Sequence, residues 1–335
     1  MSQRQPSMSG SSPAGMTISD APESPAIAAP IIDVRGLLKR YGSLAAVDGV
    51  DLQVRQNEIF GILGPNGAGK TTTLEMIEGL RQPDAGSIVV AGIDVVADPV
   101  ALKRVIGVQL QTTALFDHLS ARELIRLFAA LSGGDTSSRR VDELIALVSL
   151  EEKAGSYVDQ LSGGQRQRLS IALALVNDPT VVFLDEPTTG LDPQARRNLW
   201  DLISDLRNSG KTVVLTTHYM EEADILCDRV AVMDHGQMIA CDTPLNLIQS
   251  LDVVATIQAR LNPPVDPETI GSLIGALEIE NQGDQLFVKT RDVQTTLGAL
   301  LLRAEELGLR LENLTTAQAT LEDVFLTLTG RSLRE

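Results

Sequence analysis

The chain has 335 residues and a net charge of −16 at pH 7, because 44 acidic residues face only 28 basic ones. A hydrophobic fraction of 43% with 21% charged residues is that of a soluble globular protein with one large or two ordinary domains. The negative field repels a phosphate backbone and no basic patch offsets it, which disfavours nucleic acid as the main partner. No apolar run approaches the roughly 18 residues that a membrane-spanning helix needs.

The first 30 residues are rich in Ser, Pro, Ala and Gly and contain no apolar signal segment. We expect residues 1–30 to form a disordered lead, with a weak docking tail as the alternative. The two cysteines, Cys227 and Cys241, have neither metal-binding nor redox spacing, so reduced and packed thiols are expected. These features predict a cytoplasmic protein.

The clearest motif is a phosphate-binding loop, in which a glycine, four further residues and Gly-Lys-Thr follow one another. An apolar run at 59–63 precedes it and predicts a buried strand, and good helix formers at 71–78 follow it. The glycines let backbone N–H groups point at phosphate oxygens, the lysine reaches the β- and γ-phosphates, and the threonine hydroxyl can ligate Mg²⁺. The sequence therefore predicts a nucleoside triphosphate site. Its residues are Gly64, Pro65, Asn66, Gly67, Ala68, Gly69, Lys70 and Thr71.

A strand-like segment at 31–54 comes before this loop. It fits an antiparallel flap beside the nucleotide fold, with turns expected at Gly42-Ser43 and Asp48-Gly49. Tyr41 lies in this segment. Its ring can stack on a purine base, or it can be an exposed strand aromatic.

Beyond the loop, strands are expected at 86–91 and 105–108, and the second of these leads to Gln111. A glutamine at a strand end beside a phosphate site can supply an oxygen to Mg²⁺ or to the attacking water. Gln109 is a competitor for this role. Apolar residues at helical spacing then predict two helices of an insert, at 120–131 and 139–150.

A second phosphate-binding device begins at residues 161–165, Leu-Ser-Gly-Gly-Gln, which open a helix that runs to about Val176. Ser162 is placed to cap this helix, and Gly163 and Gly164 expose backbone amides at its start. One fold needs only one such cradle for a triphosphate. The second cradle therefore indicates a γ-phosphate that is held from two sides.

The run at 181–186 is a near-continuous apolar strand that ends in Asp185 and Glu186. Buried parallel strands have this pattern, and functional carboxylates lie at their C-terminal ends. We expect Asp185 to hold Mg²⁺, through water, and Glu186 to polarise the attacking water. A helix-capping pair is the alternative interpretation.

A helix is predicted from Pro193 to about Leu206, followed by a strand at 211–217 that ends at His218. Of the three histidines, only His218 follows a core strand, where a side chain can meet a γ-phosphate. Residues 229–241 fit a hairpin, and a short helix then runs to about Leu251.

Residues 252–330 form a new block without a phosphate loop or metal-binding spacing. Strands are expected at 253–259 and 285–289, and helices at 267–275 and 293–307. The block predicts a small α+β domain with a regulatory or dimer-supporting role, and the sequence does not choose between the two.

Together these pieces resemble the ATP-binding cassette (ABC) ATPases across roughly residues 31–245, and the Leu-Ser-Gly-Gly-Gln motif is the most specific part of the match. The resemblance implies an α/β fold with a phosphate-loop NTPase core, whose mainly parallel sheet has flanking helices. An antiparallel β subdomain and a helical insert at about 112–160 complete an ATP-binding domain at 31–250, and the small α+β domain follows it.

The resemblance also implies roles for single residues. Tyr41 stacks on adenine, and the loop from Gly64 to Thr72 cradles the phosphates. Thr71, Gln111 and Asp185 serve Mg²⁺. The catalytic residues implied are Glu186 as the catalytic glutamate, His218 as the switch histidine, and Gln111.

A head-to-tail homodimer is implied as well, with ATP between the subunits. Asp192 belongs to the loop that links the two sites. The residues that close the partner's ATP site are Ser162, Gly163, Gly164 and Gln165.

Within the family, residues 71–95 and the ending LEDVFLTLTG resemble the ATPase subunits of ABC-2-type exporters of the daunorubicin-resistance type. These subunits pair with a separate membrane permease, so the implied chemistry is ATP + H₂O to ADP + phosphate at the inner face of the cell membrane. The permease would contact the insert near Gln111. The alternative is a soluble ABC ATPase that acts on ribosomes or DNA. It is disfavoured because the chain has one cassette, no long coiled coil and an acidic balance.

Overall fold

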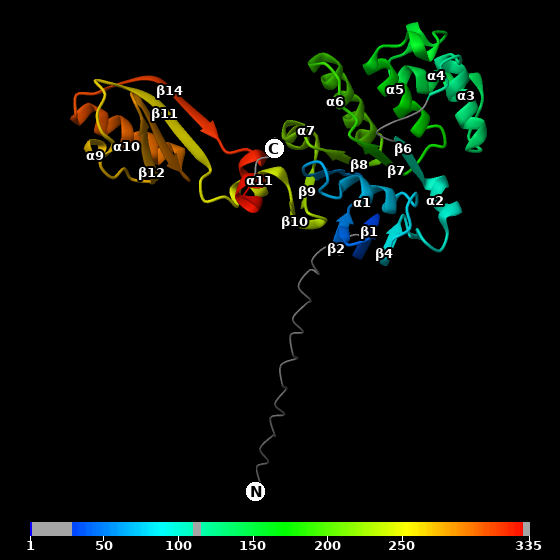
Figure 1. The fold of residues 1–335 in the computed structure, drawn as a ribbon, viewed down its shortest axis with the longest axis horizontal. Helices are drawn as coiled ribbons and strands as arrows, with labels where there is room; N and C mark the ends of the chain where they lie inside the picture. Colours follow the sequence, from blue (N-terminus) through cyan, green and yellow to red (C-terminus); the bar gives the residue numbers. More distant parts are fainter. Residues whose placement is uncertain (2–28, 110–114, 331–335) are drawn as a thin grey trace.

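Three β-sheets organise the part of the chain that the computed structural model describes, which is Met1, residues 29–109 and residues 115–330. Two sheets and most of the helices form one body. The third sheet consists of the C-terminal strands and lies apart from that body (Figure 1). The predicted α/β class is confirmed. The predicted lead at 1–30 falls almost wholly, and Gln111 entirely, outside the described residues.

The largest sheet has six strands and carries most of the predicted site. In spatial order they are β10 (Gln237–Asp242), β9 (Arg229–Asp234), β3 (Ile59–Leu63), β8 (Thr212–Thr217), β7 (Val181–Asp185) and β6 (Ile106–Gln109). All neighbours are parallel except β10, which pairs antiparallel with β9. Because carboxyl ends of parallel strands meet at one edge, the segments after β3, β8 and β7 come together there.

The two faces of this sheet pack into different cores. On β3, Ile59 and Leu63 lie in one apolar cluster with the helices of one face, whereas Phe60 and Ile62 lie in a second cluster on the other. Every residue of β3, β7 and β8 is buried, as expected of strands that are covered on both sides. The helices of this body outside the insert are α1 (Lys70–Ile77), α2 (Pro99–Val105), α5 (Gly163–Ala174), α6 (Pro193–Asn208), α7 (Met220–Leu226) and α8 (Pro244–Gln249).

The predicted flap is an antiparallel sheet. Its strands lie in the order β2 (Leu44–Val54), β1 (Ile32–Tyr41), β4 (Ala85–Val90) and β5 (Ile93–Asp94). The turn expected at Asp48-Gly49 was wrong, because β2 runs through it. Leu37 pairs with Val50 and Leu38 with Asp48, so Gly49 is an extra residue in the strand, with a φ of 72°. A glycine in this conformation forms a β-bulge, which the sequence alone does not distinguish from a turn.

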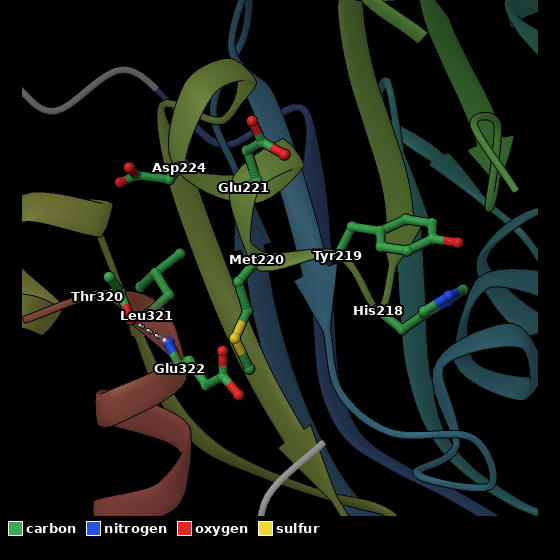
Figure 2. A pocket seen from close by; sticks show the side chains of 8 residues that line it. All are labelled: His218, Tyr219, Met220, Glu221, Asp224, Thr320, Leu321 and Glu322. Atoms are coloured by element: carbon green, nitrogen blue, oxygen red, sulfur yellow. Dashed lines mark hydrogen bonds between the residues drawn. The ribbon is translucent and has the colours of Figure 1, made fainter. Parts of the chain in front are cut away.

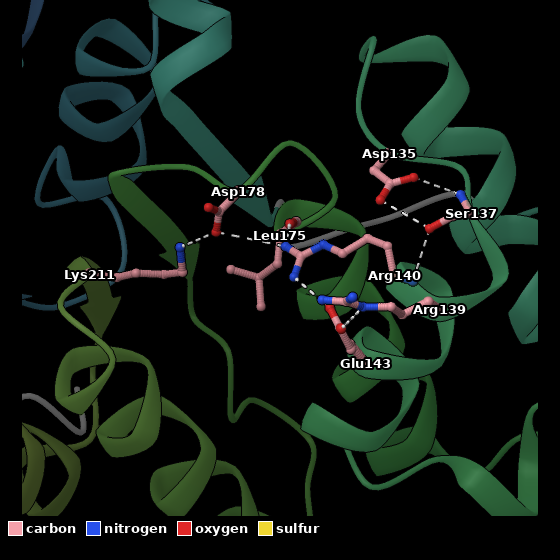
Figure 3. A network of polar contacts seen from close by, with 8 residues as sticks. All are labelled: Asp135, Ser137, Arg139, Arg140, Glu143, Leu175, Asp178 and Lys211. Atoms are coloured by element: carbon pink, nitrogen blue, oxygen red, sulfur yellow. Dashed lines mark hydrogen bonds and ion pairs between the residues drawn. The ribbon is translucent and has the colours of Figure 1, made fainter.

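From residue 115 onward, where the structure describes it, the insert holds two α-helices and two short 3₁₀ helices. They are α3 (Ala121–Leu131), α4 (Ser138–Leu147), η1 (Glu151–Lys153) and η2 (Val158–Gln160). Figure 3 shows how α4 is joined to the core: Arg140 lies 3.7 Å from Asp178, which accepts a 2.8 Å hydrogen bond from Lys211 just before β8. Arg140 also donates to the Leu175 carbonyl oxygen at 3.3 Å. Since Asp178 is largely exposed, these contacts orient the insert more than they stabilise it.

The C-terminal block forms a four-stranded antiparallel sheet with a core of its own. Its elements are β11 (Ala255–Asn262), α9 (Pro267–Ile270), β12 (Ala276–Gln282), β13 (Gln285–Thr290), α10 (Val293–Glu306) and β14 (Arg310–Gln318). The helix predicted at 267–275 ends at Ile270, because Gly271 and Gly275 both adopt positive φ angles. The edge strands β12 and β14 were not predicted. Both are largely polar and contain no buried residue, so they lack the alternation of a half-buried strand.

The last described helix, α11 (Leu321–Thr329), packs on the nucleotide-binding body and not on the C-terminal sheet. Leu321, Val324 and Phe325 are buried in the same cluster as Leu247 and Leu251. Figure 1 shows the red helix α11 beside the body, with the orange sheet displaced from it. The chain therefore leaves this core after α8 and returns to it at α11.

Truncating the anchor of α11 should destabilise the nucleotide-binding body. Phe325 is 1% exposed, so Phe325→Ala removes a buried ring and should lower the free energy of unfolding by about 3–5 kcal/mol. The single tryptophan, Trp200 in α6, reports on the body during urea titration. The neighbouring Leu326 is 47% exposed, so Leu326→Ala should stay within about 1 kcal/mol of wild type. Equal effects of the two substitutions would contradict the packing of α11 described above.

Candidate functional site

The phosphate-binding loop joins β3 to α1 and folds closely around the Lys70 side chain. Its ammonium donates hydrogen bonds to the carbonyl oxygens of Gly64 at 2.8 Å and Pro65 at 3.1 Å, and only 5% of the side chain is exposed. Gly69 has a φ of 100°, and a Cβ there would lie 2.4 Å from the Ala46 carbonyl oxygen. A glycine is therefore required at this position. Burial lowers the pKa of Lys70, while Glu186 opposes the shift.

A cleft of about 340 Å³ opens beside this loop. Its wall includes one aromatic ring, residues of the loop and the start of α1, and one carboxylate. The lining residues are Tyr41, Leu44, Ala46, Asn66, Gly67, Gly69, Lys70, Thr71, Thr72 and Glu186. The structure thus brings together the aromatic residue, the loop and one of the two acids that the sequence indicated.

The two acids at the end of β7 are held by a residue of the neighbouring strand. The hydroxyl of Thr216 in β8 donates to the Asp185 carboxylate and accepts from the backbone N–H of Glu186 at 3.0 Å. The Thr71 hydroxyl lies 3.4 Å from the same carboxylate, so the start of α1 and the end of β7 converge on Asp185. Burial raises the pKa of Asp185, and the hydrogen bond from Thr216 opposes that shift.

The Glu186 side chain lies between two basic groups. One of its oxygens is 3.6 Å from Lys70 Nζ and the other is 3.3 Å from His218 Nδ1. The backbone takes a φ of 45° at Glu186, which is uncommon for a non-glycine residue and turns the chain sharply after β7. The Thr189 hydroxyl donates to the same carboxylate at 3.2 Å. This geometry presents a carboxylate to the cleft with its position fixed from three sides.

His218 follows β8, as predicted, and it also borders a second cavity. This cavity has a volume of about 500 Å³ and lies between α7 and the start of α11. Figure 2 shows the residues that line it, with His218 and Tyr219 on the right and Leu321 and Glu322 of α11 on the left. Glu322 donates its backbone N–H to the Thr320 hydroxyl at 3.2 Å. The segment that carries His218 is therefore next to the C-terminal helix.

The second predicted cradle does not join the cleft of its own chain. Ser162 caps α5, accepting from the Gln165 backbone N–H at 3.3 Å, while the Gln165 side chain accepts from the Ser162 N–H at 2.9 Å. Ser162 and Gly163 are exposed, and neither lines the cleft. Asp192 caps α6 by accepting from two backbone N–H groups at 3.0 and 2.9 Å. Its role in linking two sites stays a prediction.

Sequence reasoning missed Thr216, the residue that holds both acids. Its signal was the change from apolar to polar residues at the end of an otherwise apolar strand, Val-Val-Leu-Thr-Thr. Such threonines also occur where they only fill a strand, so the pattern alone does not assign a role. The pairing of β7 with β8, in which Asp185 lies opposite Thr216, supplies the missing information.

A further acid lies buried behind the site. Glu78 follows α1 and is 3% exposed, and its Oε1 has no hydrogen-bond partner among the described residues. Burial raises its pKa to about 8, and the negative charges of Asp185 and Glu75 act in the same direction. Glu78 is therefore protonated across most of the neutral range.

Nine-tenths or more of the chain is similar to curated export proteins. It is 40% identical over 324 residues to the "Nod factor export ATP-binding protein I" of Ralstonia nicotianae, covering 94% of this chain and 99% of that protein. It is 39% identical over 310 residues to the "Daunorubicin resistance ATP-binding protein DrrA3" of Streptomyces coeruleorubidus, covering 90% and 97%. A family model described as ABC transporter matches residues 47–189. The chain belongs to the ABC transporter ATP-binding proteins.

Solved structures agree with this assignment over the nucleotide-binding body. A dimeric ATP-binding cassette in a post-hydrolysis state, bound to ADP and Pi, aligns with a TM-score of 0.58 and 29% identity, covering 63% of this chain and 98% of that one. The cbiO1 protein of Clostridium perfringens, part of the ABC transporter complex cbiONQ, aligns with a TM-score of 0.62 and 28% identity, covering 66% and 92%.

The ABC protein described here is thus an ATP-binding and ATP-hydrolysing subunit of the exporter type, as its sequence predicted. These relatives give no support to the alternative of an ABC ATPase for ribosomes or DNA. In the described part of the chain, no helix is long and apolar enough to cross a membrane.

Glu78 should make the stability of this ABC ATPase depend on pH. Its folded-state pKa of about 8 lies above the ordinary 4.5, so its contribution is fully present below about pH 4.5 and is lost as the pH rises through 8. Glu78→Gln keeps the neutral form. Its advantage over wild type in free energy of unfolding should therefore grow by a few kcal/mol between pH 5 and 9.

Urea titrations across this pH range measure the difference. Glu152 is exposed, so Glu152→Gln is a matched control that should follow the wild-type curve. A constant difference between Glu78→Gln and wild type at every pH would show that Glu78 is not a buried neutral acid.

Proposed function

We propose that this ABC ATPase works as a homodimer in which each ATP lies between the cleft of one subunit and the start of α5 of the other. One observation carries the proposal. Lys70, Asp185, Glu186 and His218 converge in one chain, while Ser162 and Gly163 at the start of α5 are exposed and do not line the cleft of that chain. A second copy is what places those amides over the γ-phosphate.

Mg²⁺ fits the donor set at the end of β7. The Thr71 hydroxyl and the Asp185 carboxylate lie 3.4 Å apart beside the phosphate loop, and both offer the oxygen ligands that Mg²⁺ prefers. When bound, the ion would neutralise charge on the β- and γ-phosphates. Gln111 is proposed as a further ligand. The loop 64–72 binds the phosphates, and Tyr41 stacks on the adenine ring.

Glu186 is the proposed base for hydrolysis. Its carboxylate lies between Lys70 and His218, where it can accept a proton from water placed in line with the γ-phosphate. His218 then contacts the same phosphate, and Asp192 links the two sites of the dimer.

The work of hydrolysis would drive a separate membrane permease, which would hold this ATPase at the inner face of the membrane. We place the permease contact on the helical insert near Gln111, where Phe116 is 56% exposed. Residues 252–330 would support the dimer or regulate it. The ATP-binding domain itself is proposed to span 31–250.

Removal of the proposed base Glu186 should abolish most ATP hydrolysis while ATP binding is retained. Glu186→Gln keeps the size of the side chain and one acceptor oxygen but removes the charge and the base, so ATP should still bind, while turnover should fall by about 10²–10⁴-fold. ATP should then hold a stable dimer, which size-exclusion chromatography can detect. Glu152→Gln again serves as the exposed control and should keep wild-type turnover. A Glu186→Gln protein that stays monomeric with ATP would count against the shared site.

Complementation between two broken subunits tests the shared site directly. Lys70→Ala removes the charge that faces the phosphates, and Ser162→Arg puts a bulky cation where the α5 amides should meet them, so each mutant dimer has two damaged sites. In a hybrid both lesions fall on one site and the other site is intact. Random mixing makes about half of the dimers hybrid, a binomial estimate for equivalent subunits.

Equimolar mixtures should therefore regain binding of one ATP per hybrid dimer, measured by equilibrium titration with a fluorescent ATP analogue. Mixtures that form hybrids and yet bind no more ATP than the separate mutants would exclude a site built from two chains.

A further inference from the structure

Two cations lie near the Tyr41 ring, which lines the cleft. The guanidinium carbon of Arg81 lies 5.5 Å from the centroid of the Tyr41 ring, and the Lys39 ammonium lies 6.0 Å from it. Tyr41 lines the cleft and is 42% exposed, whereas neither cation lines it. The Tyr41 ring therefore contacts the two cations and also contributes to the wall of the cleft.

Arg81 is held in this place by the helix that begins with the phosphate-binding lysine. Its Nε lies 2.6 Å from a carboxylate oxygen of Glu75 in α1, and its backbone N–H donates to the Glu75 carbonyl oxygen at 3.0 Å. Only 37% of the Arg81 side chain is exposed. A side chain fixed at both its backbone and its guanidinium loses little further freedom when a ligand binds.

The connection that carries Arg81 is also fastened to the strand that carries Tyr41. The Lys39 ammonium donates to the Gln82 carbonyl oxygen and to the Asp84 carboxylate, both at 2.8 Å. Asp84 in turn accepts from the Arg40 backbone N–H at 2.7 Å. These contacts connect the end of β1 with the end of α1, so the base-binding and phosphate-binding parts of the cleft form one unit.

A cation beside an aromatic ring is attracted to its π electrons and withdraws electron density from it. The contact keeps a half-exposed ring in one orientation and lowers its electron density. A ring with lower electron density is a better stacking partner for an electron-rich purine. Stacking on a purine needs no group from Arg81 itself.

We infer that Arg81 is a positioning residue for nucleotide binding, which acts through Tyr41 on the purine base and not on the phosphates. The inference rests on the proposed nucleotide cleft and adds to it a residue that selects for the base.

The test compares two ligands that share a diphosphate, of which only one has a base. ADP and inorganic pyrophosphate are titrated by calorimetry into the wild-type chain and its variants, since neither is consumed by ATP hydrolysis. Arg81→Ala should raise the Kd of ADP by about two- to fivefold, the effect of an exposed cation–π contact. The Kd of pyrophosphate should not change. Arg81→Lys keeps a cation and should recover part of the loss.

A matched control and a double substitution separate this role from a structural one. Arg139 forms the same kind of pair, with its Nε 2.9 Å from Glu143, on the surface of α4, so Arg139→Ala should leave both affinities unchanged. In a Tyr41→Leu background, Arg81→Ala should cause no further loss of ADP affinity. A loss that persists there, or an equal loss for pyrophosphate, would overturn the inference.

The proposed nucleotide site is tested in the same series. Lys70→Ala should weaken both ligands, because its charge faces the phosphates. If Lys70→Ala weakens the binding of both ligands while Arg81→Ala binds ADP as wild type does, the inferred role of Arg81 is wrong and the proposed nucleotide site stands. If Lys70→Ala changes neither affinity, the proposed nucleotide site fails and the inference fails with it.

Discussion

The hydroxyl of Thr216 is the contact on which the arrangement of the site depends. It joins two neighbouring strands by donating to Asp185 and accepting from the backbone of Glu186, so one atom fixes the carboxylate proposed for Mg²⁺ and the backbone of the proposed base. The sharp turn at Glu186, with its φ of 45°, then carries that carboxylate to Lys70 and His218. Three adjacent strand ends thus form one site, because the order β3-β8-β7 in the sheet leaves no strand between them.

Buried charge is concentrated around this edge of the sheet. Lys70 and Asp185 are both buried. Burial lowers the pKa of Lys70 and raises the pKa of Asp185, so it favours the neutral form of each side chain. Neutral groups there would bind phosphate and a cation poorly, so the opposing contacts matter: Glu186 favours the charged lysine and Thr216 favours the charged aspartate. No group among the residues that the structure describes lowers the pKa of Glu78 in this way, and its pKa rises to about 8.

Features encoded by adjacent residues could be predicted from the sequence, whereas features that depend on contacts between distant segments could not. The loop from Gly64 to Thr71 is a run of adjacent residues whose spacing carries its own geometry, and the strand that ends at Asp185 is continuously apolar, so both were predicted correctly as elements. Thr216 was missed because its role exists only through pairing with β7. The bulge at Gly49 was taken for a turn because a glycine with positive φ serves both. The edge strand β14 escaped prediction because nearly all of its residues are exposed, which leaves no periodic pattern.

The return of the chain at α11 has a consequence for how the protein is made. Leu321, Val324 and Phe325 complete a core whose other buried members run from Ile59 to Leu251, so that core stays unfinished until residues 321–325 have been synthesised. The C-terminal sheet, whose contacts are mostly among its own strands, can form earlier than the completed body to which it is joined. An ATPase that ends before α11 would leave the apolar surface next to the His218 segment open to solvent. The packed core of the nucleotide-binding body therefore forms only after the C-terminal sheet, which lies between its two parts in the sequence, has been synthesised.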